Sequence, residues 1–279
     1  MKRKICVLSL MLCFLMAAAY TGHAKTNVWM RDYFNAADDY IKGKSVFEVE
    51  DGYVFIGQKD SYNGVLWVHT DFDGNVLDDH SFELSSGDAA KVVRADRDAS
   101  GNFYILGKIS SDSHFIIKTD SSGNQLWTKR IRSNNTYTQD IVDDIKVTSD
   151  GGFILAASGD NPSNSADAAI LKFNSSGTLQ WQYSDDLFDE EVVSVAESSS
   201  STGYVYVTKR RAKASDDDLR ITKISTNGSL LWRKAVGIYS AQPTHIQATQ
   251  DGFIVVGNWE NIEGNSQDFF IVKIDDNGN

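Results

Sequence analysis

Carboxylates are the residues of this chain that could most readily do chemistry, because they recur just ahead of a repeated type of apolar segment. The acidic groups are Asp38 with Asp39, Asp88, Asp140 with Asp143 and Asp144, and Asp189 with Glu190 and Glu191. Carboxylates around one opening would raise each other's pKa or attract a cation. The structural alternative is that each accepts hydrogen bonds from free backbone N–H groups of a neighbouring segment. In the last repeat, Gln242-Pro243-Thr244-His245 replaces the acids.

Paired carboxylates are also the catalytic groups of glycoside hydrolases, and such a pair could come from Asp88, Asp140, Asp143 and Glu190. Trp259 and Tyr62 lie near predicted loops, where they could stack on sugar rings, anchor a protein partner or pack against the loop backbone. The candidate ligand-binding residues are therefore Asp88, Asp140, Asp143, Asp189, Glu190, Trp259 and Tyr62.

Other motifs for metal binding or catalysis are incomplete. Residues 96–101 begin like a calcium loop, but Gly107 stands where a bidentate Glu should close it, so a hairpin turn is the simpler interpretation. His69, His80, His114 and His245 lack the spacing of metal ligands. No G-x-S-x-G motif for a serine nucleophile is present. We therefore expect no metal, no cofactor and no catalytic nucleophile.

Two series of glycine turns divide the chain into five units. The first series, Gly52, Gly101, Gly151, Gly203 and Gly252, has intervals of 49 to 52 residues, and the second is Gly74, Gly123, Gly177, Gly228 and Gly278. Short runs rich in β-branched and aromatic residues, such as YVFIG, FYILG and FIVVG, follow the first series and indicate strands. Each unit contains four such runs, which is typical of a propeller blade. The sequence therefore predicts an all-β, five-bladed β-propeller of four-stranded antiparallel blades.

The two ends of the chain predict how the ring closes. The last unit stops at Asn279, where a fourth strand is due, and Asn27 to Phe34 supply a segment with the missing Trp. We expect this N-terminal segment to complete the fifth blade and so remove exposed sheet edges. Trp29, Trp127, Trp181 and Trp232 occupy one equivalent position, with Asp78 in the first unit, and we expect these rings to fill the space between blades.

The repeats resemble those of exported bacterial β-propeller-repeat proteins. The matching motifs are DGGFILAA, the D-x4-K pattern from Asp167 to Lys172, and NG-x-L-x-W. The SGNQLW element also resembles the tryptophan docking motif of quinoprotein-type propellers, which implies that the segments ending at the Asp-Gly turns are innermost. Quinoprotein dehydrogenases hold pyrroloquinoline quinone near a vicinal disulfide, whereas both cysteines here, Cys6 and Cys13, precede residue 24. The resemblance therefore implies the fold and no quinone.

Residues 1–24 have the basic, apolar and small-residue regions of a secretory signal peptide, which leaves residues 25–279 as one domain. We expect a secreted or periplasmic monomer that does not insert into a membrane after cleavage. Removing Lys2, Arg3 and Lys4 takes the formal charge from −11 to −14, which argues against nucleic-acid binding.

The predicted strand order places all short turns at one rim and all longer loops at the other. Loops on a rigid scaffold usually carry recognition. The sequence therefore favours a non-catalytic module that binds a glycan, peptide or protein through its longer-loop face. A glycoside hydrolase and a structural surface-assembly protein are the alternatives.

Overall fold

The computed structural model describes residues 41–59, 64–83, 90–110, 113–132, 141–160, 166–185, 190–210, 219–238, 240–260 and 267–279. Within these ranges the chain forms 19 β-strands and no helix. The strands make five antiparallel sheets, four of them with four strands and the last with three, and we call each sheet a blade. The prediction of an all-β chain built from four-stranded antiparallel units is thus confirmed for the first four units.

Within each blade the strands pair in chain order. The first blade contains β1 (Ile41–Val49), β2 (Gly52–Lys59), β3 (Gly64–Asp71) and β4 (Val76–Glu83). The second contains β5 (Lys91–Arg97), β6 (Phe103–Ser110), β7 (Ser113–Thr119) and β8 (Gln125–Arg132). The third contains β9 (Ile141–Val147), β10 (Phe153–Asp160), β11 (Ala166–Phe173) and β12 (Leu179–Asp185). The fourth contains β13 (Glu190–Glu197), β14 (Tyr204–Arg210), β15 (Leu219–Ile224) and β16 (Leu230–Val236). The fifth contains β17 (Gln242–Thr249), β18 (Gly252–Glu260) and β19 (Gln267–Asp275).

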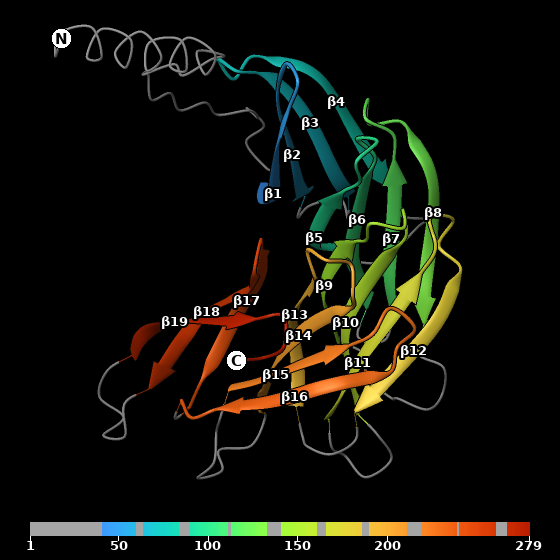
Figure 1. Cartoon of the computed structure of the whole chain (residues 1–279). Helices are drawn as coiled ribbons and strands as arrows, with labels where there is room; N and C mark the ends of the chain where they lie inside the picture. The colour runs from blue at the N-terminus through green and yellow to red at the C-terminus, as the bar shows by residue number, and fades with distance from the viewer. Residues whose placement is uncertain are drawn as a thin grey trace, which may run out of the picture.

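The blades follow one another along an arc, which in Figure 1 is open between the first blade and the fifth. The first strand of each blade lies innermost, because β1 contacts β5, β5 contacts β9, β9 contacts β13 and β13 contacts β17. Strands β4, β8, β12 and β16 lie at the periphery (Figure 1). This is the arrangement of β-propeller blades around an axis. The predicted closing strand, residues 27–34, lies outside the described residues.

The connections alternate between two rims because each blade is an antiparallel meander. The short turns from β1 to β2 and from β3 to β4, with their counterparts in the other blades, form what we call the short-turn rim. The opposite rim, which we call the long-loop rim, carries the connections between β2 and β3 and those between blades. Asp120 shows how a short turn is held: its carboxylate accepts hydrogen bonds from the N–H groups of Ser122 and Asn124, both at 2.9 Å.

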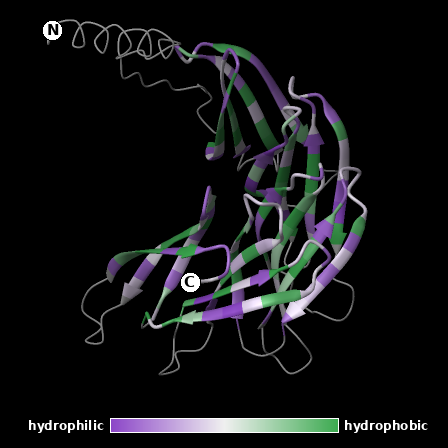
Figure 2. Ribbon diagram, in the orientation of Figure 1, coloured by the Kyte–Doolittle hydropathy of each residue, from purple (hydrophilic) through white to green (hydrophobic). Residues whose placement is uncertain are grey.

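Four apolar cores fill the spaces between adjacent blades. Figure 2 shows the hydrophobic residues along the strands that contribute to these cores. Phe153 of the third blade, for example, lies 5.4 Å from the ring of Tyr104 in the second blade and 4.9 Å from the ring of Phe173 in its own blade. Burial of such side chains stabilises each blade-to-blade contact by roughly 2 to 3 kcal/mol per large residue.

The recurring tryptophans join neighbouring blades, as predicted. Trp181 on β12 packs on the turn of the fourth blade, and its Nε1 donates to the carbonyl oxygen of Thr226 at 3.0 Å. Gly228 makes this approach possible, because it has φ 82° and a Cβ there would lie 2.8 Å from the indole. Trp232 repeats the contact by donating to the carbonyl oxygen of Asp276 at 3.1 Å. Trp29 lies outside the described residues.

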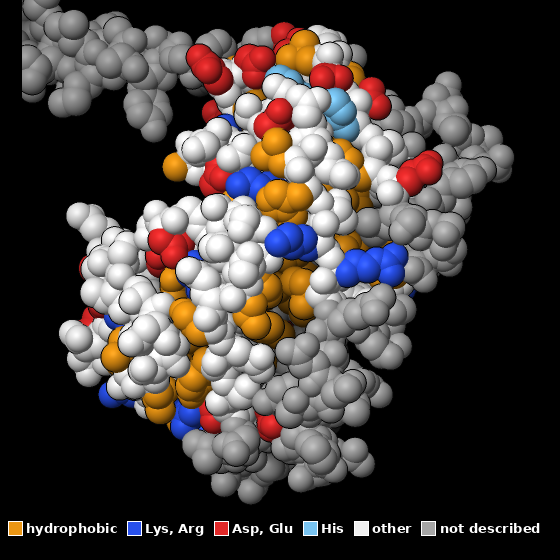
Figure 3. Space-filling model, turned by 90° about the vertical axis from the view of Figure 1, so that its right-hand side faces the viewer, with side chains coloured by type: hydrophobic (Ala, Val, Ile, Leu, Met, Phe, Trp, Pro, Cys, Tyr) orange, Lys and Arg blue, Asp and Glu red, His pale blue; other side chains and the backbone are white. Residues whose placement is uncertain are grey.

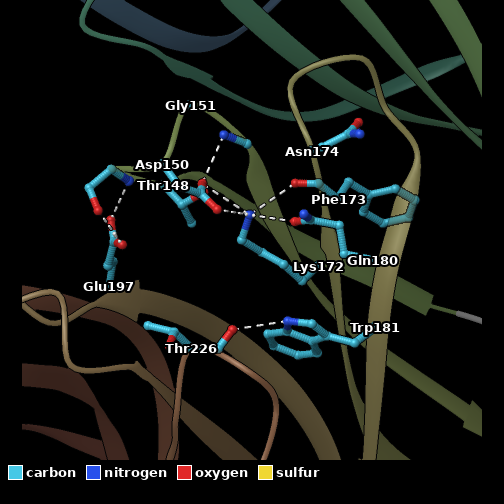
Figure 4. Close-up of polar contacts among 12 residues, drawn as sticks. Thr148, Asp150, Gly151, Lys172, Phe173, Asn174, Gln180, Trp181, Glu197 and Thr226 are labelled. Atoms are coloured by element: carbon cyan, nitrogen blue, oxygen red, sulfur yellow. Dashed lines mark hydrogen bonds and ion pairs between the residues drawn. The ribbon is translucent and has the colours of Figure 1, made fainter.

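A buried lysine ties the strands of a blade together at the short-turn rim. In Figure 4 the Lys172 amine lies between Asp150 and the carbonyl oxygen of Phe173. Its Nζ donates to Asp150 Oδ2 at 2.8 Å and to Gln180 Oε1 at 3.2 Å. The equivalent Lys223 of the fourth blade donates to Thr202 Oγ1 of its own blade at 2.9 Å and pairs with Asp276 Oδ2 of the fifth blade at 2.6 Å. The recurring D-x4-K lysine is therefore an architectural residue in these blades.

The periphery is partly apolar. Figure 3 views this side of the molecule and shows apolar side chains between patches of Lys and Arg. Exposed aliphatic residues recur at the start of the outer strands, namely Val76, Leu77, Leu126, Leu179, Leu230 and Leu231. Among the described residues no helix is long and apolar enough to cross a membrane.

Candidate functional site

The innermost strand of every blade contains a β-bulge at the same position. The strand pairing skips one residue in each case, at Lys44, Val93, Asp143, Val193 and Thr244. A bulge re-aims the side chains that follow it. The residues directly after the bulges are Ser45, Arg94, Asp144, Ser194 and His245, at intervals of 49 to 51 residues. We call these five the axial positions.

Axial side chains satisfy backbone N–H groups of the next inner strand. Ser45 Oγ accepts from the N–H of Ala95 at 3.0 Å, and Asp144 Oδ2 accepts from the N–H of Val195 at 3.1 Å. The inner edge of each blade has no strand partner, so these N–H groups need acceptors from side chains. Of the two roles considered for the acidic residues, Asp144 therefore has the structural one: it accepts a hydrogen bond from a backbone N–H group of the neighbouring blade.

Arg94 breaks this pattern because a guanidinium has no acceptor. Its Nη1 donates instead to Asp144 Oδ1 at 3.1 Å and contacts His245 Nδ1 at 3.2 Å. Ser194 Oγ lies between the same two partners, 2.7 Å from Asp144 Oδ2 and 3.1 Å from His245 Nδ1. Four of the five axial positions, from four different blades, thus form one hydrogen-bonded network.

The imidazole of His245 is neutral in this network. Burial lowers its pKa from the usual 6.5, the charges of Arg94 and Lys146 lower it further, and Asp144 opposes them. Because Arg94 can only donate, Nδ1 of His245 must be the acceptor, which places the imidazole proton on Nε2. The Ser194, His245 and Asp144 side chains do not form a nucleophilic triad, since the serine lies between the acid and the histidine and is fully buried.

A cavity of about 140 Å³ lies beside this network, lined by residues 94–96, 144–146, 195–197 and 245–248. These residues belong to the half of each inner strand that leads to the short-turn rim. Asp96 Oδ2 accepts from the N–H of Val147 at 2.7 Å and pairs with Lys146 Nζ at 3.1 Å. Glu197 accepts from the N–H and the hydroxyl of Ser149 at 2.7 and 2.8 Å. We call this space the axial cavity.

Two of the predicted carboxylates lie at the long-loop end of the inner strands. Burial raises the pKa of Asp143 to about 6, with the charges of Glu191 and Asp144 adding to the rise and those of Lys209 and Lys108 opposing it. Glu191 itself pairs with Lys209 Nζ at 2.8 Å. Asp143 therefore holds its proton closer to neutral pH than an ordinary Asp does.

Glu190 is buried and engaged within its own blade. Its Oε1 pairs with Arg220 Nε at 2.6 Å, and its Oε2 accepts from the Thr208 hydroxyl at 2.7 Å. An ion pair of this kind fixes the carboxyl in place. The geometry therefore favours a structural role for Glu190 over a ligand contact.

Trp259 lies on β18 and not in a loop. It is half-buried and packs against the apolar core between the fourth and fifth blades. The remaining predicted site residues lie outside the described residues, namely Asp88, Asp140, Asp189 and Tyr62, as do Asp38 and Asp39. The structure thus places Asp143 and Glu190 at the long-loop end of the inner strands and Trp259 against the core between the fourth and fifth blades.

The half calcium motif at residues 96–101 forms a turn. Asp98 accepts from the N–H groups of Ser100 and Asn102 at 2.9 Å, while Asp96 points to the neighbouring blade. Among the residues that the structure describes, no three or more His, Cys, Asp or Glu side chains are grouped to hold a metal ion.

Sequence reasoning did not select Arg94, Ser194 or Lys146. Asp144 and His245 stood out only as members of the segments before the inner strands. The signal that could have found the axial set is the spacing of about 50 residues itself, since the five positions align once the Asp-Gly turns are superimposed.

Comparison with known proteins supports the fold and goes no further. No protein-family model and no curated protein sequence matches the chain. BBS1N, in complex with ARL6DN, matches with a TM-score of 0.52 and 7% identity, over 86% of this chain and 68% of that one. A protein from Lactobacillus plantarum matches with a TM-score of 0.51 and 10% identity, over 78% and 67%.

An enzyme is among the similar structures. The exo-beta-1,3-galactanase of Phanerochaete chrysosporium, crystallised with galactose, matches with a TM-score of 0.50 and 8% identity, over 84% of this chain. This chain spans 60% of the galactanase. At such identities the likeness shows the fold alone, because similar folds carry unrelated functions.

Proposed function

We propose that this chain is a non-catalytic binding module built on a five-bladed β-propeller, with its ligand site on the axis. The observation that carries this proposal is the axial cavity, a concave space formed by inner strands of four blades and lined by both charged and apolar residues. The carboxylates around it, Asp96, Asp144 and Glu197, are hydrogen-bonded to backbone N–H groups. Carboxylates fixed in this way shape a rigid site but are poorly placed to transfer protons.

The five-bladed ring is part of the proposal, and exposed apolar residues on β19 support it. Phe269 and Ile271 are 74% and 63% exposed, whereas their equivalents on β7, His114 and Ile116, are 2% and 1% exposed. In the first four blades a fourth strand lies beside the third. Residues 27–34 have the sequence of such a strand, so we propose that they cover the edge of β19.

Export and the class of ligand also remain proposals. The signal-like residues 1–24 and the resemblance to exported repeat proteins favour a secreted or periplasmic monomer. A glycan, peptide or protein could also bind at the long-loop rim, where Asp88, Asp140, Asp189 and Tyr62 would add contacts. The charge of −14 after signal cleavage disfavours nucleic acid.

Asp143 supports a second candidate function, glycoside hydrolysis. A carboxyl with a pKa of about 6 near a second acidic group, here Glu191, resembles the pair that such enzymes use as a general acid and its partner. The structural likeness to a galactanase is compatible with this function. In this scheme Asp143 would protonate the leaving-group oxygen.

A thermal-shift screen of glycans, peptides and small anions tests the proposal, because a ligand that binds only the folded chain raises its Tm. Each ligand that raises the Tm is then incubated with the protein and analysed for cleavage products. Binding without products supports the binding module. Products that disappear with Asp143→Asn support the hydrolase instead. Absence of binding together with self-association at micromolar concentration would favour a structural surface-assembly protein.

A further inference from the structure

Two of the three acidic groups that line the axial cavity, Asp144 and Asp96, use most of their capacity to accept hydrogen bonds, whereas Glu197 accepts two, both from Ser149. Asp144 accepts four: Oδ1 from Arg94 and the N–H of Ile145, and Oδ2 from Ser194 and the N–H of Val195. An ionised carboxylate offers about four acceptor sites. Asp144 therefore has no acceptor left to offer a ligand.

Asp96 is engaged in the same way. Its Oδ1 accepts from the N–H of Arg97 at 2.9 Å, and its Oδ2 accepts from the N–H of Val147 and from Lys146. Its side chain is only 16% exposed. Both carboxylates therefore offer few free acceptors to a molecule in the cavity, because they are engaged by the two cations and by backbone N–H groups.

The two cationic groups, in contrast, keep donors for a ligand. Among the described residues Arg94 makes its contacts through Nη1, although a guanidinium has five N–H groups. Lys146 makes one contact, with Asp96, and its ammonium has three N–H groups. The Arg94 and Lys146 side chains are 36% and 39% exposed, and both line the axial cavity.

We propose that the axial cavity binds a small oxyanion, with a carboxylate as its preferred form, through Arg94 and Lys146. This inference rests on the proposed binding function and names its ligand class. An acceptor-rich ligand would accept hydrogen bonds from the unused N–H groups of Arg94 and Lys146, whereas a donor-rich ligand would find the acceptors of Asp144 and most of those of Asp96 occupied. Because Asp144 and Asp96 balance the two cations and Glu197 adds a further negative charge, recognition comes from directed N–H groups and not from net charge.

The volume limits the size of the ligand. A cavity of about 150 Å³ holds one benzene molecule, so the 140 Å³ here suits roughly six non-hydrogen atoms. That is a carboxylate with a short stem. The carboxylate could belong to a free small acid, or it could be borne by a larger ligand such as an acidic peptide or a uronic acid.

Thermal-shift titrations of the full chain test this inference. The probes are sodium acetate, inorganic phosphate, a glutamate-containing tripeptide and galacturonate, each against sodium chloride at equal ionic strength. We expect at least one probe to raise the Tm above the chloride reference. A rise with acetate or phosphate identifies free anions as ligands. A rise confined to the peptide or to galacturonate identifies a carboxylate borne by a larger molecule.

Lys146→Met removes one cationic donor and should weaken binding about tenfold or more, since a hydrogen bond to a charged group contributes that much. Lys91→Met is the matched control, because Lys91 is exposed at the other end of an inner strand and does not line the cavity. Lys146→Gln replaces Lys146→Met if circular dichroism shows that the latter is unfolded.

Two results would overturn the inference: no probe shifts the Tm beyond chloride, or Lys146→Met binds as tightly as the unmodified chain. A screened ligand that binds equally to both proteins would leave the binding module intact while refuting its oxyanion site.

Discussion

Asp143→Asn should stabilise the protein, and the gain should depend on pH. The pKa of Asp143 is raised from 3.8 to about 6, mainly by burial, so the folded state holds this proton more tightly than the unfolded state. Ionisation of Asp143 therefore costs stability. The cost is absent below pH 3.8, grows between pH 4 and 6, and is complete above the folded pKa.

The size of the effect follows from the shift. A rise of about two pKa units corresponds to about 3 kcal/mol, at 1.36 kcal/mol per unit. Asparagine cannot ionise, so Asp143→Asn should raise the free energy of unfolding by up to about 3 kcal/mol at pH 8 and leave it nearly unchanged at pH 4. For a domain of this size the gain at pH 8 corresponds to roughly 6 to 12 °C in Tm.

Urea unfolding followed by tryptophan fluorescence at pH 4, 6 and 8 measures this difference. Asp79→Asn, which removes an exposed carboxylate from the peripheral strand β4, controls for the loss of one negative charge. A variant that is no more stable than the unmodified chain at pH 8, or whose gain is equal at pH 4 and pH 8, would refute the account of Asp143.

Three further predictions concern the axial network and the contacts between strands and blades. Because the pKa of His245 is lowered in the folded state, its contribution to the free energy of unfolding is fully present above pH 6.5 and decreases as the pH falls below that value. His245→Gln should therefore reduce the loss of stability between pH 7 and pH 5, which urea titrations at the two pH values would measure. Trp181→Ala should cost about 2 to 4 kcal/mol, because it empties the contact with the next blade; an unchanged Tm would contradict the docking role. Asp150→Ala should destabilise by about 3 kcal/mol and more than Lys172→Met does, since it leaves a buried ammonium without its partner; chemical denaturation of both variants decides the order.

Most of the fold was predictable from the sequence because local chemistry repeats. A glycine with positive φ and a capping Asp, Asn or Ser fix most of the short turns within a few residues, and the runs between them have strong strand propensity. The tryptophan contact was predictable for the same reason, since Trp127, Trp181 and Trp232 each stand at a fixed distance from such a turn. Ring closure remains a prediction, because the segment that would complete it lies outside the described residues.

The candidate site was harder to predict because its geometry depends on a one-residue bulge. Asp143 and Asp144 are neighbours in the sequence, yet the bulge assigns Asp144 to hydrogen bonds with the next blade and leaves Asp143 with a raised pKa. No sequence pattern marks which of two adjacent acids a bulge selects. Arg94 and Lys146 escaped notice because single basic residues on strands carry no motif, and only the packing of several blades brings them to one cavity.

Anomalous diffraction from crystals grown with sodium selenate tests the central claim, that the axial cavity is the ligand site, most directly. Selenate is an oxyanion small enough for the cavity, and selenium can be located without a model of the ligand. The account predicts a selenium peak in the cavity, with selenate oxygens at about 2.7 to 3.1 Å from nitrogens of Arg94 and Lys146. A cavity without selenium in crystals that bind selenate elsewhere would contradict the claim.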